Sequence, residues 1–105
     1  LQPSLYSTKK KLANFENWLL KQNASHPSLS DYNRALYKLF RNHLPSKAKS
    51  EGYIFLDADN AIENVKEAVF VDHVHLSDRG NRLIGKHLAK VIKPLLIQQG
   101  LLCRD

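Results

Sequence analysis

Cysteine is nearly absent from this chain of 105 residues, in which Cys103 is the only one. A single thiol excludes an internal disulfide and any zinc site built mainly from cysteine ligands. The sequence also lacks an apolar run near the roughly 18 residues that span a bilayer. With 43% hydrophobic and 25% charged residues, the composition indicates an ordinary globular protein, and the length indicates a single domain.

Acidic residues are in the minority. Ten Asp and Glu stand against sixteen Lys and Arg, which gives a formal net charge of +6. Such an excess can attract phosphates or acidic surfaces. The basic residues are scattered, however, and the densest run is only Lys9–Lys11. We therefore predict a solvated basic surface without nucleic-acid binding, and keep a small basic module that binds anions or nucleic acid as the alternative.

The N-terminus lacks an initiating Met, and it lacks the basic segment and apolar stretch of a signal peptide. Leu1-Gln2-Pro3 is instead similar to the end of a buried strand. We therefore expect the chain to be a fragment of a longer protein. Any signal peptide would precede Leu1, so an extracytoplasmic location is compatible with this sequence.

Three segments have apolar residues at the three- and four-residue spacings of amphipathic helices. Their expected bounds are Ser7 or Thr8 to Asn23, Ser30 or Asp31 to Leu44, and about Asp78 to Leu96 or Gln98. Residues 23–30 are predicted to form a loop. Pro45 is expected to end or kink the second helix. Ser77 is expected to cap the third helix, and Gly100 to stop it.

Strand-forming residues are scarce. Tyr53–Asp57 is a short run of such residues after Gly52, which is typical of a buried strand that follows a helix. Residues 58–68 could hold at most a short helix. One clear strand with three helices cannot make a parallel sheet without neighbouring strands. The pattern therefore predicts that a partner segment is missing from the chain.

The densest polar cluster, Asp72-His73-Val74-His75, has three interpretations. In a metal site, His73 and His75 would point to the same side of an extended segment. In a purely structural loop, the histidines would satisfy backbone groups, and spacing alone favours this interpretation. In a catalytic pair, Asp72 would turn back to Nδ1 of His75 within one tight loop. For the metal interpretation, a further ligand would have to be His26, His43 or His87, and none of these lies at a spacing typical of a metal site.

The wider sequence VFVDHVHLSDRGN, residues 69–81, followed by an amphipathic helix, resembles the last conserved block of the SGNH (GDSL-like) hydrolase family. That block has the form Asp-x-x-His-Leu, then a glycine, then the C-terminal helix. Matched position by position, Asp72 falls on the triad aspartate and His75 on the catalytic histidine. Gly80 matches the glycine that opens the terminal helix, and His73 falls on an unspecified position.

The resemblance implies an α/β fold, namely a three-layer α/β/α flavodoxin-like sandwich with a parallel sheet. Residues 1–105 would be the C-terminal portion of a single hydrolase domain. Leu1–Pro3 looks like the end of the family's fourth strand, and Tyr53–Asp57 looks like its fifth strand. The active-site loop would lie at the carboxyl end of a strand.

The resemblance also implies hydrolysis of a carboxylic ester by a serine nucleophile. His75 would be the general base and then the general acid, and Asp72 would orient it. No metal or organic cofactor is implied. The expected partners are an ester substrate, which is a small molecule, a lipid or an acylated saccharide, and the N-terminal part of the same hydrolase.

The chain departs from the family because it lacks the blocks that carry the nucleophile and the oxyanion hole. The family's nucleophile lies in an N-terminal Gly-Asp-Ser block, and its oxyanion hole uses a Gly and an Asn from other blocks. No Gly-Asp-Ser occurs here. Ser77 is better explained as an N-cap, and Asn81 belongs to a helix start. This chain alone is therefore expected to be inactive, and a non-catalytic α/β interaction domain remains an alternative.

Overall fold

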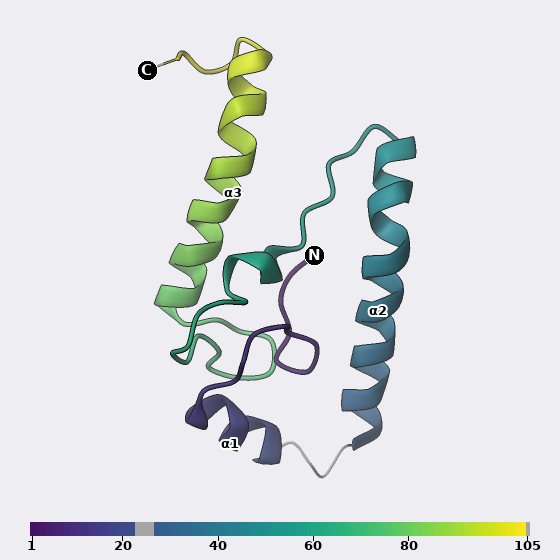
Figure 1. The fold of residues 1–105 in the computed structure, drawn as a ribbon, viewed down its shortest axis with the longest axis vertical. Helices are drawn as coiled ribbons and strands as arrows, with labels where there is room; N and C mark the ends of the chain where they lie inside the picture. Colours follow the sequence, from purple (N-terminus) through teal and green to yellow (C-terminus); the bar gives the residue numbers. More distant parts are fainter. Residues whose placement is uncertain (23–26, 105) are drawn as a thin grey trace.

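The computed structural model describes residues 1–22 and 27–104. Within these ranges the regular elements are α1 (Asn14–Gln22), α2 (Pro27–Ser50), the 3-10 helix η2 (Ala58–Ala61) and α3 (Asp78–Gln98). The molecule measures 51 × 30 × 17 Å. Helices α2 and α3 run along the long axis, α1 lies across one end, and the non-helical segments fill the space between them (Figure 1). None of the described helices is long and apolar enough to cross a membrane.

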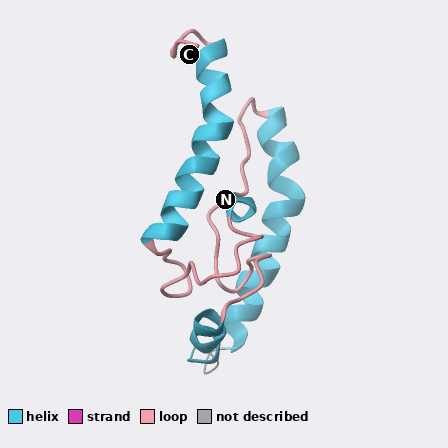
Figure 2. Ribbon diagram, turned by 60° about the vertical axis from the view of Figure 1, so that its left-hand side comes forward, coloured by secondary structure: helices cyan, strands magenta, loops and turns pink. Residues whose placement is uncertain are grey.

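The described residues contain no β-strand, and an isolated antiparallel bridge joins Phe70 and Leu76. Figure 2 accordingly shows helices and loops without a sheet. The predicted α/β/α flavodoxin-like sandwich with a parallel sheet is therefore wrong for this structure. Residues 53–57 are extended but not paired as a strand. Backbone pairing occurs only near the end of this segment, with Leu1. The Leu1 amino group donates to the Leu56 carbonyl at 2.5 Å, and the Leu1 carbonyl accepts from the Ala58 amide at 2.9 Å.

The physical reason lies in the backbone groups of that extended segment. A buried strand must pair its N–H and C=O groups along its edges, which a parallel sheet achieves with neighbouring strands. Here Tyr53 and Ile54 are 73% and 64% exposed, so this segment contacts solvent where a sheet would have neighbouring strands. The prediction of a buried strand at this segment fails because the required partners do not occur among the described residues.

Helix α1 begins at Asn14, later than the predicted Ser7 or Thr8. Residues 4–8 instead form a turn, in which the Ser4 carbonyl accepts from the amides of Ser7 and Thr8. The Glu16 side chain reaches back to the Ala13 amide at 2.9 Å, as the acidic partner of a capping box does. The helix therefore starts where the free N–H of Ala13 finds an acceptor. Asn23, the predicted end, lies outside the described residues.

Helix α2 begins at Pro27 and continues through Pro45 to Ser50, so both predicted bounds are wrong. Proline suits the first position of a helix because its missing N–H needs no partner there. Beyond Pro45 the last turns have their own support, since the Ser46 hydroxyl donates to the His43 carbonyl at 3.1 Å. Gly52, with φ of +76°, follows the helix in the left-handed conformation that glycine favours. Residues 23–26 of the predicted loop lie outside the described residues.

The predictions for the last helix and for residues 58–68 are confirmed. Ser77 is the N-cap of α3, and its hydroxyl accepts from the Gly80 amide at 3.2 Å. The helix includes Pro94 and ends at Gln98, close to Gly100 with its φ of +70°. Residues 58–68 contain only the single 3-10 turn of η2.

The hydrophobic core is small and lies mainly under non-helical segments. Leu5, Ile62, Val69 and Phe70 are at most 2% exposed. Partly buried side chains from α1, α3 and the neighbouring loops pack around them: Leu12, Leu19, Leu20, Ala61, Val65, Leu76, Leu83 and Ile84. No α2 residue whose side chain the structure describes belongs to this cluster. The core therefore fixes α1, η2, α3 and the residue 69–76 loop, whereas α2 must be held by other contacts.

Gly80 allows α3 to start directly against the loop that precedes it. A Cβ at this position would lie 2.9 Å from the Val69 carbonyl oxygen and 3.1 Å from Cβ of Leu76. We expect Gly80→Ala to lower the free energy of unfolding by about 1–3 kcal/mol, the usual cost of overpacking. Urea denaturation followed by circular dichroism measures this difference.

Gly85→Ala is the matched control, because no atom lies within 4 Å of its Cβ position on the same helix. This substitution should raise stability by about 0.5–1 kcal/mol through helix propensity. Equal effects of the two substitutions would show that Gly80 does not make the close approach described here.

Candidate active site

A closed loop presents the polar cluster that precedes α3. Its ends are tied by two backbone hydrogen bonds, from Val71 to the His75 carbonyl at 3.0 Å and from Ser77 to the Val69 carbonyl at 2.8 Å. Phe70, at the base of the loop, is 1% exposed. The loop is therefore short, closed at its base and anchored in the core, while the His75 side chain faces solvent.

Asp72 organises the inside of this loop. Its Oδ1 accepts from the amides of Val74 at 2.8 Å and His75 at 2.7 Å. Its Oδ2 lies 2.7 Å from Nδ1 of His75. The predicted return of Asp72 to Nδ1 of His75 within one tight loop is thus confirmed as a contact. Because a protonated Nδ1 leaves Nε2 as an acceptor, this contact selects the tautomer that a general base requires.

The same contacts determine the charge of Asp72. The amides of Val74 and His75, followed by the His75 ring, lower the pKa of Asp72 from 3.8 to about 2. The carboxylate therefore stays ionised far below neutral pH. The His75 and Asp72 side chains are 72% and 45% exposed, so a reacting group from another segment can approach the imidazole.

His73 lies in the same loop but has a different role. Its carbonyl accepts from the Leu5 amide at 2.9 Å, and its ring packs on Tyr6 with centroids 5.7 Å apart. On the neighbouring residue, the Val74 carbonyl accepts from the Gln2 side chain at 3.2 Å. The N-terminal segment thereby supports the loop from one side, and His73 serves that support.

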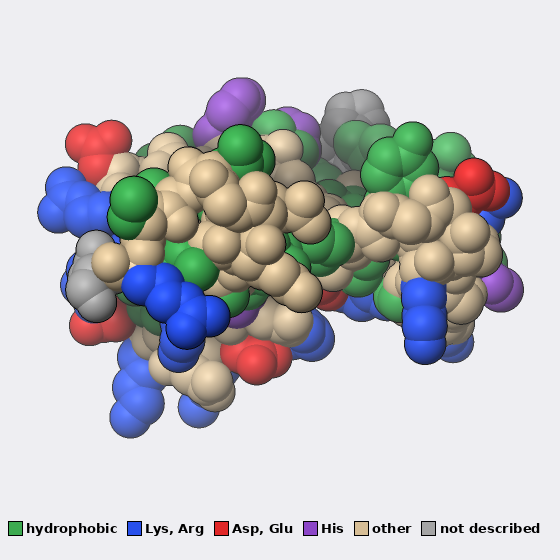
Figure 3. Space-filling view, turned by 90° about the horizontal axis from the view of Figure 1, so that it is seen from above, with side chains coloured by type: hydrophobic (Ala, Val, Ile, Leu, Met, Phe, Trp, Pro, Cys, Tyr) green, Lys and Arg blue, Asp and Glu red, His purple; other side chains and the backbone are tan. Residues whose placement is uncertain are grey.

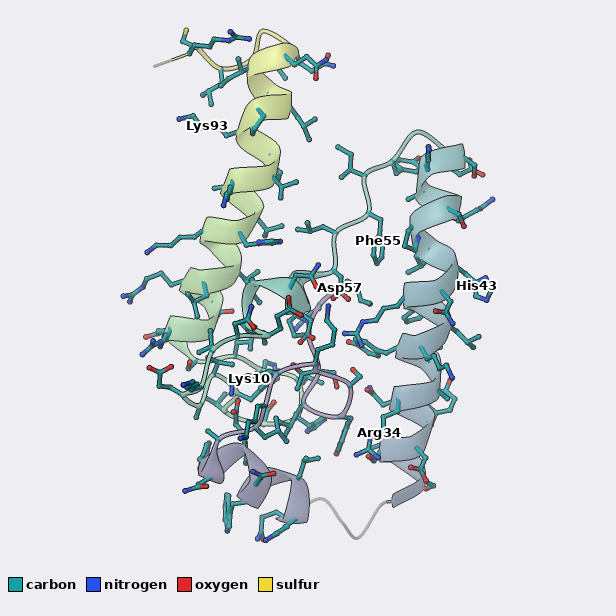
Figure 4. The ribbon with its side chains drawn as sticks, in the orientation of Figure 1. Lys10, Arg34, His43, Phe55, Asp57 and Lys93 are labelled. Carbon is teal, nitrogen blue, oxygen red and sulfur yellow. The ribbon has the colours of Figure 1, made fainter. Side chains whose placement is uncertain are left out.

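A buried ion pair holds the other side of the loop. Lys10 Nζ lies 2.6 Å from Oε1 of Glu16, and both side chains are fully buried. The second oxygen of Glu16 accepts from the amides of Val69 at 3.1 Å and Phe70 at 3.2 Å. In Figure 4 Lys10 lies between α1 and the segments that cross above it. Glu16 therefore fixes the two residues from which the Asp72 loop departs.

Sequence reasoning did not identify this pair. Glu16 has no clear signal, because the residue three positions before it is Ala13 and not the Ser, Thr, Asp or Asn of a capping-box sequence. Lys10 has none, because it is one of three consecutive lysines and its burial depends on the fold. Burial by itself raises the pKa of Glu16, but the bonds from Lys10 and from the three amides outweigh it and leave this pKa below its ordinary value.

The remaining site predictions are not brought together with His75. No group of three or more His, Cys, Asp or Glu that could hold a metal occurs in the described part of the chain. His43 lies on α2 and points away from the loop (Figure 4), and His26 lies outside the described residues. Ser77 is occupied as the N-cap of α3, and Asn81 donates to the Leu76 carbonyl at its start. Within the described ranges, no hydroxyl is hydrogen-bonded to Nε2 of His75.

Comparison of the chain with protein-family models, with curated proteins and with solved structures gives no match.

The low pKa of Asp72 predicts a pH dependence of the loop. Its carboxyl carbon, followed by NMR, should titrate with a midpoint of about 2. A pKa lowered on folding adds stability above the ordinary value of 3.8, and this stability is lost as the pH falls toward 2. In His75→Ala the midpoint should stay below 3.8, because the two backbone amides are the main cause of the shift. A midpoint of 3.8 in the unchanged protein would contradict the loop geometry.

The buried pair predicts a large effect of Glu16→Gln on stability. The substitution leaves Lys10 buried without its counter-ion, which costs about 3–5 kcal/mol in comparable cases. The effect should be largest near neutral pH and shrink in acid, because the lowered pKa of Glu16 makes its contribution disappear as the pH falls below about 4.5. Urea unfolding at several pH values measures both.

Glu51→Gln is the control for this experiment. Glu51 also pairs with a lysine, Lys47, at 2.7 Å, but both side chains are more than half exposed. Its removal should change the unfolding free energy by less than about 0.5 kcal/mol. Similar losses in both variants would mean that the Lys10–Glu16 pair is not buried in solution.

Proposed function

We propose that this chain supplies the Asp–His pair of a serine hydrolase that cleaves carboxylic esters. The observation that supports the proposal is the 2.7 Å contact between Oδ2 of Asp72 and Nδ1 of His75, which leaves Nε2 as the ring nitrogen that can accept a proton. The resemblance of residues 69–81 to the last block of the SGNH hydrolases gives the same two residues these roles. The proposal concerns the loop and its chemistry, and it does not depend on a sheet.

In this proposal His75 acts twice. Its Nε2 first takes the proton of a serine hydroxyl while the serine oxygen attacks the ester carbonyl. The imidazolium then gives that proton to the leaving alcohol, and an acyl-serine remains. In the second half, Nε2 takes a proton from water as the water oxygen attacks the acyl group, and returns it to the serine oxygen on release of the carboxylic acid.

Asp72 acts through His75 in both halves. Its carboxylate holds Nδ1–H, which keeps the ring in one orientation and stabilises the imidazolium while it exists. The low pKa of Asp72 suits this role, because the carboxylate keeps its charge at every pH at which His75 could act as a base. Water that hydrates an exposed pair would weaken this stabilisation, so the segment that brings the serine must also cover the loop.

The serine and the oxyanion hole lie outside the described residues in this proposal. The exposure of His75 is consistent with it, since an imidazole that works on a serine from another segment must be accessible from that side. The expected substrate is an ester of a small alcohol, a lipid or a saccharide. The sequence resemblance, rather than any residue contact, supports the ester over other acyl compounds.

The test is hydrolysis of p-nitrophenyl acetate by the longer protein in which this chain is joined to a Gly-Asp-Ser segment. His75→Ala should lower kcat by a factor on the order of 1,000 or more, as for other triad histidines. Asp72→Asn should also lower kcat strongly, because the amide favours the wrong tautomer. Circular dichroism checks that each variant keeps its helices.

His73→Phe is the matched control in the same loop. It keeps a ring against Tyr6 and removes the second imidazole, so kcat should change by less than about threefold if His75 alone is the base. The hydrolase proposal is wrong if His75→Ala leaves kcat unchanged. It is also wrong if His73→Phe and His75→Ala reduce kcat equally.

A further inference from the structure

A cavity of about 410 Å³ lies between α2 and the turn that follows the N-terminal segment. From α2 it is lined by Arg34, Lys38 and Arg41, and from the turn by residues 6–8. The three cationic residues are four and three positions apart and therefore share one face of the helix. No acidic residue lines the cavity. This charge distribution favours an anionic occupant.

Both guanidinium groups are held in place by the protein itself. Nε of Arg41 lies 2.7 Å from Oδ2 of Asp57, and its Nη1 donates to the Ser7 carbonyl at 2.8 Å. Nε of Arg34 donates to the Tyr6 carbonyl at 3.0 Å. Figure 4 shows Arg34 extending from α2 toward the N-terminal turn. Such preorganised groups lose little freedom when they bind a ligand.

Two buried polar atoms beside this cavity have no hydrogen-bond partner. They are the hydroxyl oxygen of Ser7 and Nη2 of Arg41, and no other buried side-chain N or O atom of the described residues is in this state. Both belong to residues that line the cavity. Buried polar atoms in native proteins are nearly always paired. The Ser7 hydroxyl has no hydrogen-bond partner, and Nη2 of Arg41 has only an ion-pair contact with Asp59 at 3.5 Å, so both atoms have capacity left for a further acceptor.

We propose that this cavity binds a tetrahedral oxyanion, a phosphate or sulfate group that is either free or part of a larger molecule. Arg34 and Arg41 would donate N–H groups to its oxygens, which match the planar fork of a guanidinium. Lys38 would add a positive charge, and a small shift of the Ser7 hydroxyl would bring a further donor. Tyr6 lines the cavity and also packs against His73 in the Asp72 loop. The anion-binding proposal is nevertheless independent of the hydrolase function.

Neighbouring carboxylates limit the affinity without cancelling the attraction. Asp57 and Asp59 pair with Arg41 but do not line the cavity, and Asp31 lies 3.9 Å from Nη1 of Arg34 on the exposed surface. Lys38 has no ion-pair partner among the described residues. In the view of Figure 3, Lys and Arg side chains are spread around the molecule. A test must therefore distinguish binding at the cavity from attraction of anions to the net positive charge of the whole protein.

The test is an NMR titration of the full chain with sodium phosphate, with ionic strength kept constant by sodium chloride. The amides of residues 6–8 and 34–42 should shift and saturate at millimolar phosphate. Lys38→Ala should weaken binding by about tenfold, the equivalent of one charged hydrogen bond. Lys49→Ala removes the same charge from the exposed end of the same helix and should leave the dissociation constant within about twofold.

The outcomes separate a built site from general attraction. Equal weakening by Lys38→Ala and Lys49→Ala, or shifts that do not saturate, would overturn the proposal. Unchanged spectra in phosphate would overturn it as well. Phenyl phosphate in a parallel titration identifies the source. Tighter binding than inorganic phosphate supports a phosphorylated molecule as the ligand, and binding of inorganic phosphate alone supports the free ion. Ser7→Ala, which keeps every cation, should weaken binding less than Lys38→Ala.

Discussion

Most of this structure depends on the contacts that the carboxylate of Glu16 makes. It neutralises Lys10, caps α1 through the Ala13 amide, and binds the amides of Val69 and Phe70. A buried ion pair is costly to desolvate, and it is favourable only where further hydrogen bonds complete the coordination of both ions. Here three backbone amides do so for the carboxylate. One side chain thereby joins the N-terminal segment, the first helix and the base of the Asp72 loop.

Helix α2 is attached in a different way, by polar contacts at its inner face. Arg41 joins it to Asp57 and the Ser7 carbonyl, and the Tyr37 hydroxyl donates to the Gln2 carbonyl at 2.7 Å. Large apolar side chains of this helix remain exposed, among them Tyr32 at 66% and Leu39 at 54%. The molecule therefore combines a small apolar core near α1 and the base of α3 with a helix held by ion pairs and hydrogen bonds.

The Asp72–His75 contact belongs to neither of these networks, because it is local. Asp72 binds two amides and one ring within three residues of itself, and these bonds need only the closed loop. This explains how the pair that sequence resemblance singled out is formed although the described residues contain no sheet of the kind that the same resemblance implies. In the hydrolase that we propose, the serine would come from a distant part of a polypeptide. A local pattern predicts the base, but it cannot place the nucleophile.

The sequence by itself determined the features whose partners are near in the chain. The Ser77 cap, the extent of α3, the limit of residues 58–68 to at most a short helix and the return of Asp72 to His75 each depend on contacts over a few residues. Only the tertiary structure decided the rest. The unpaired segment at residues 53–57 and the burial of Lys10 depend on groups far apart in sequence. Backbone and charged groups form whichever bonds the folded chain offers them, and no local pattern records which distant partner will be present.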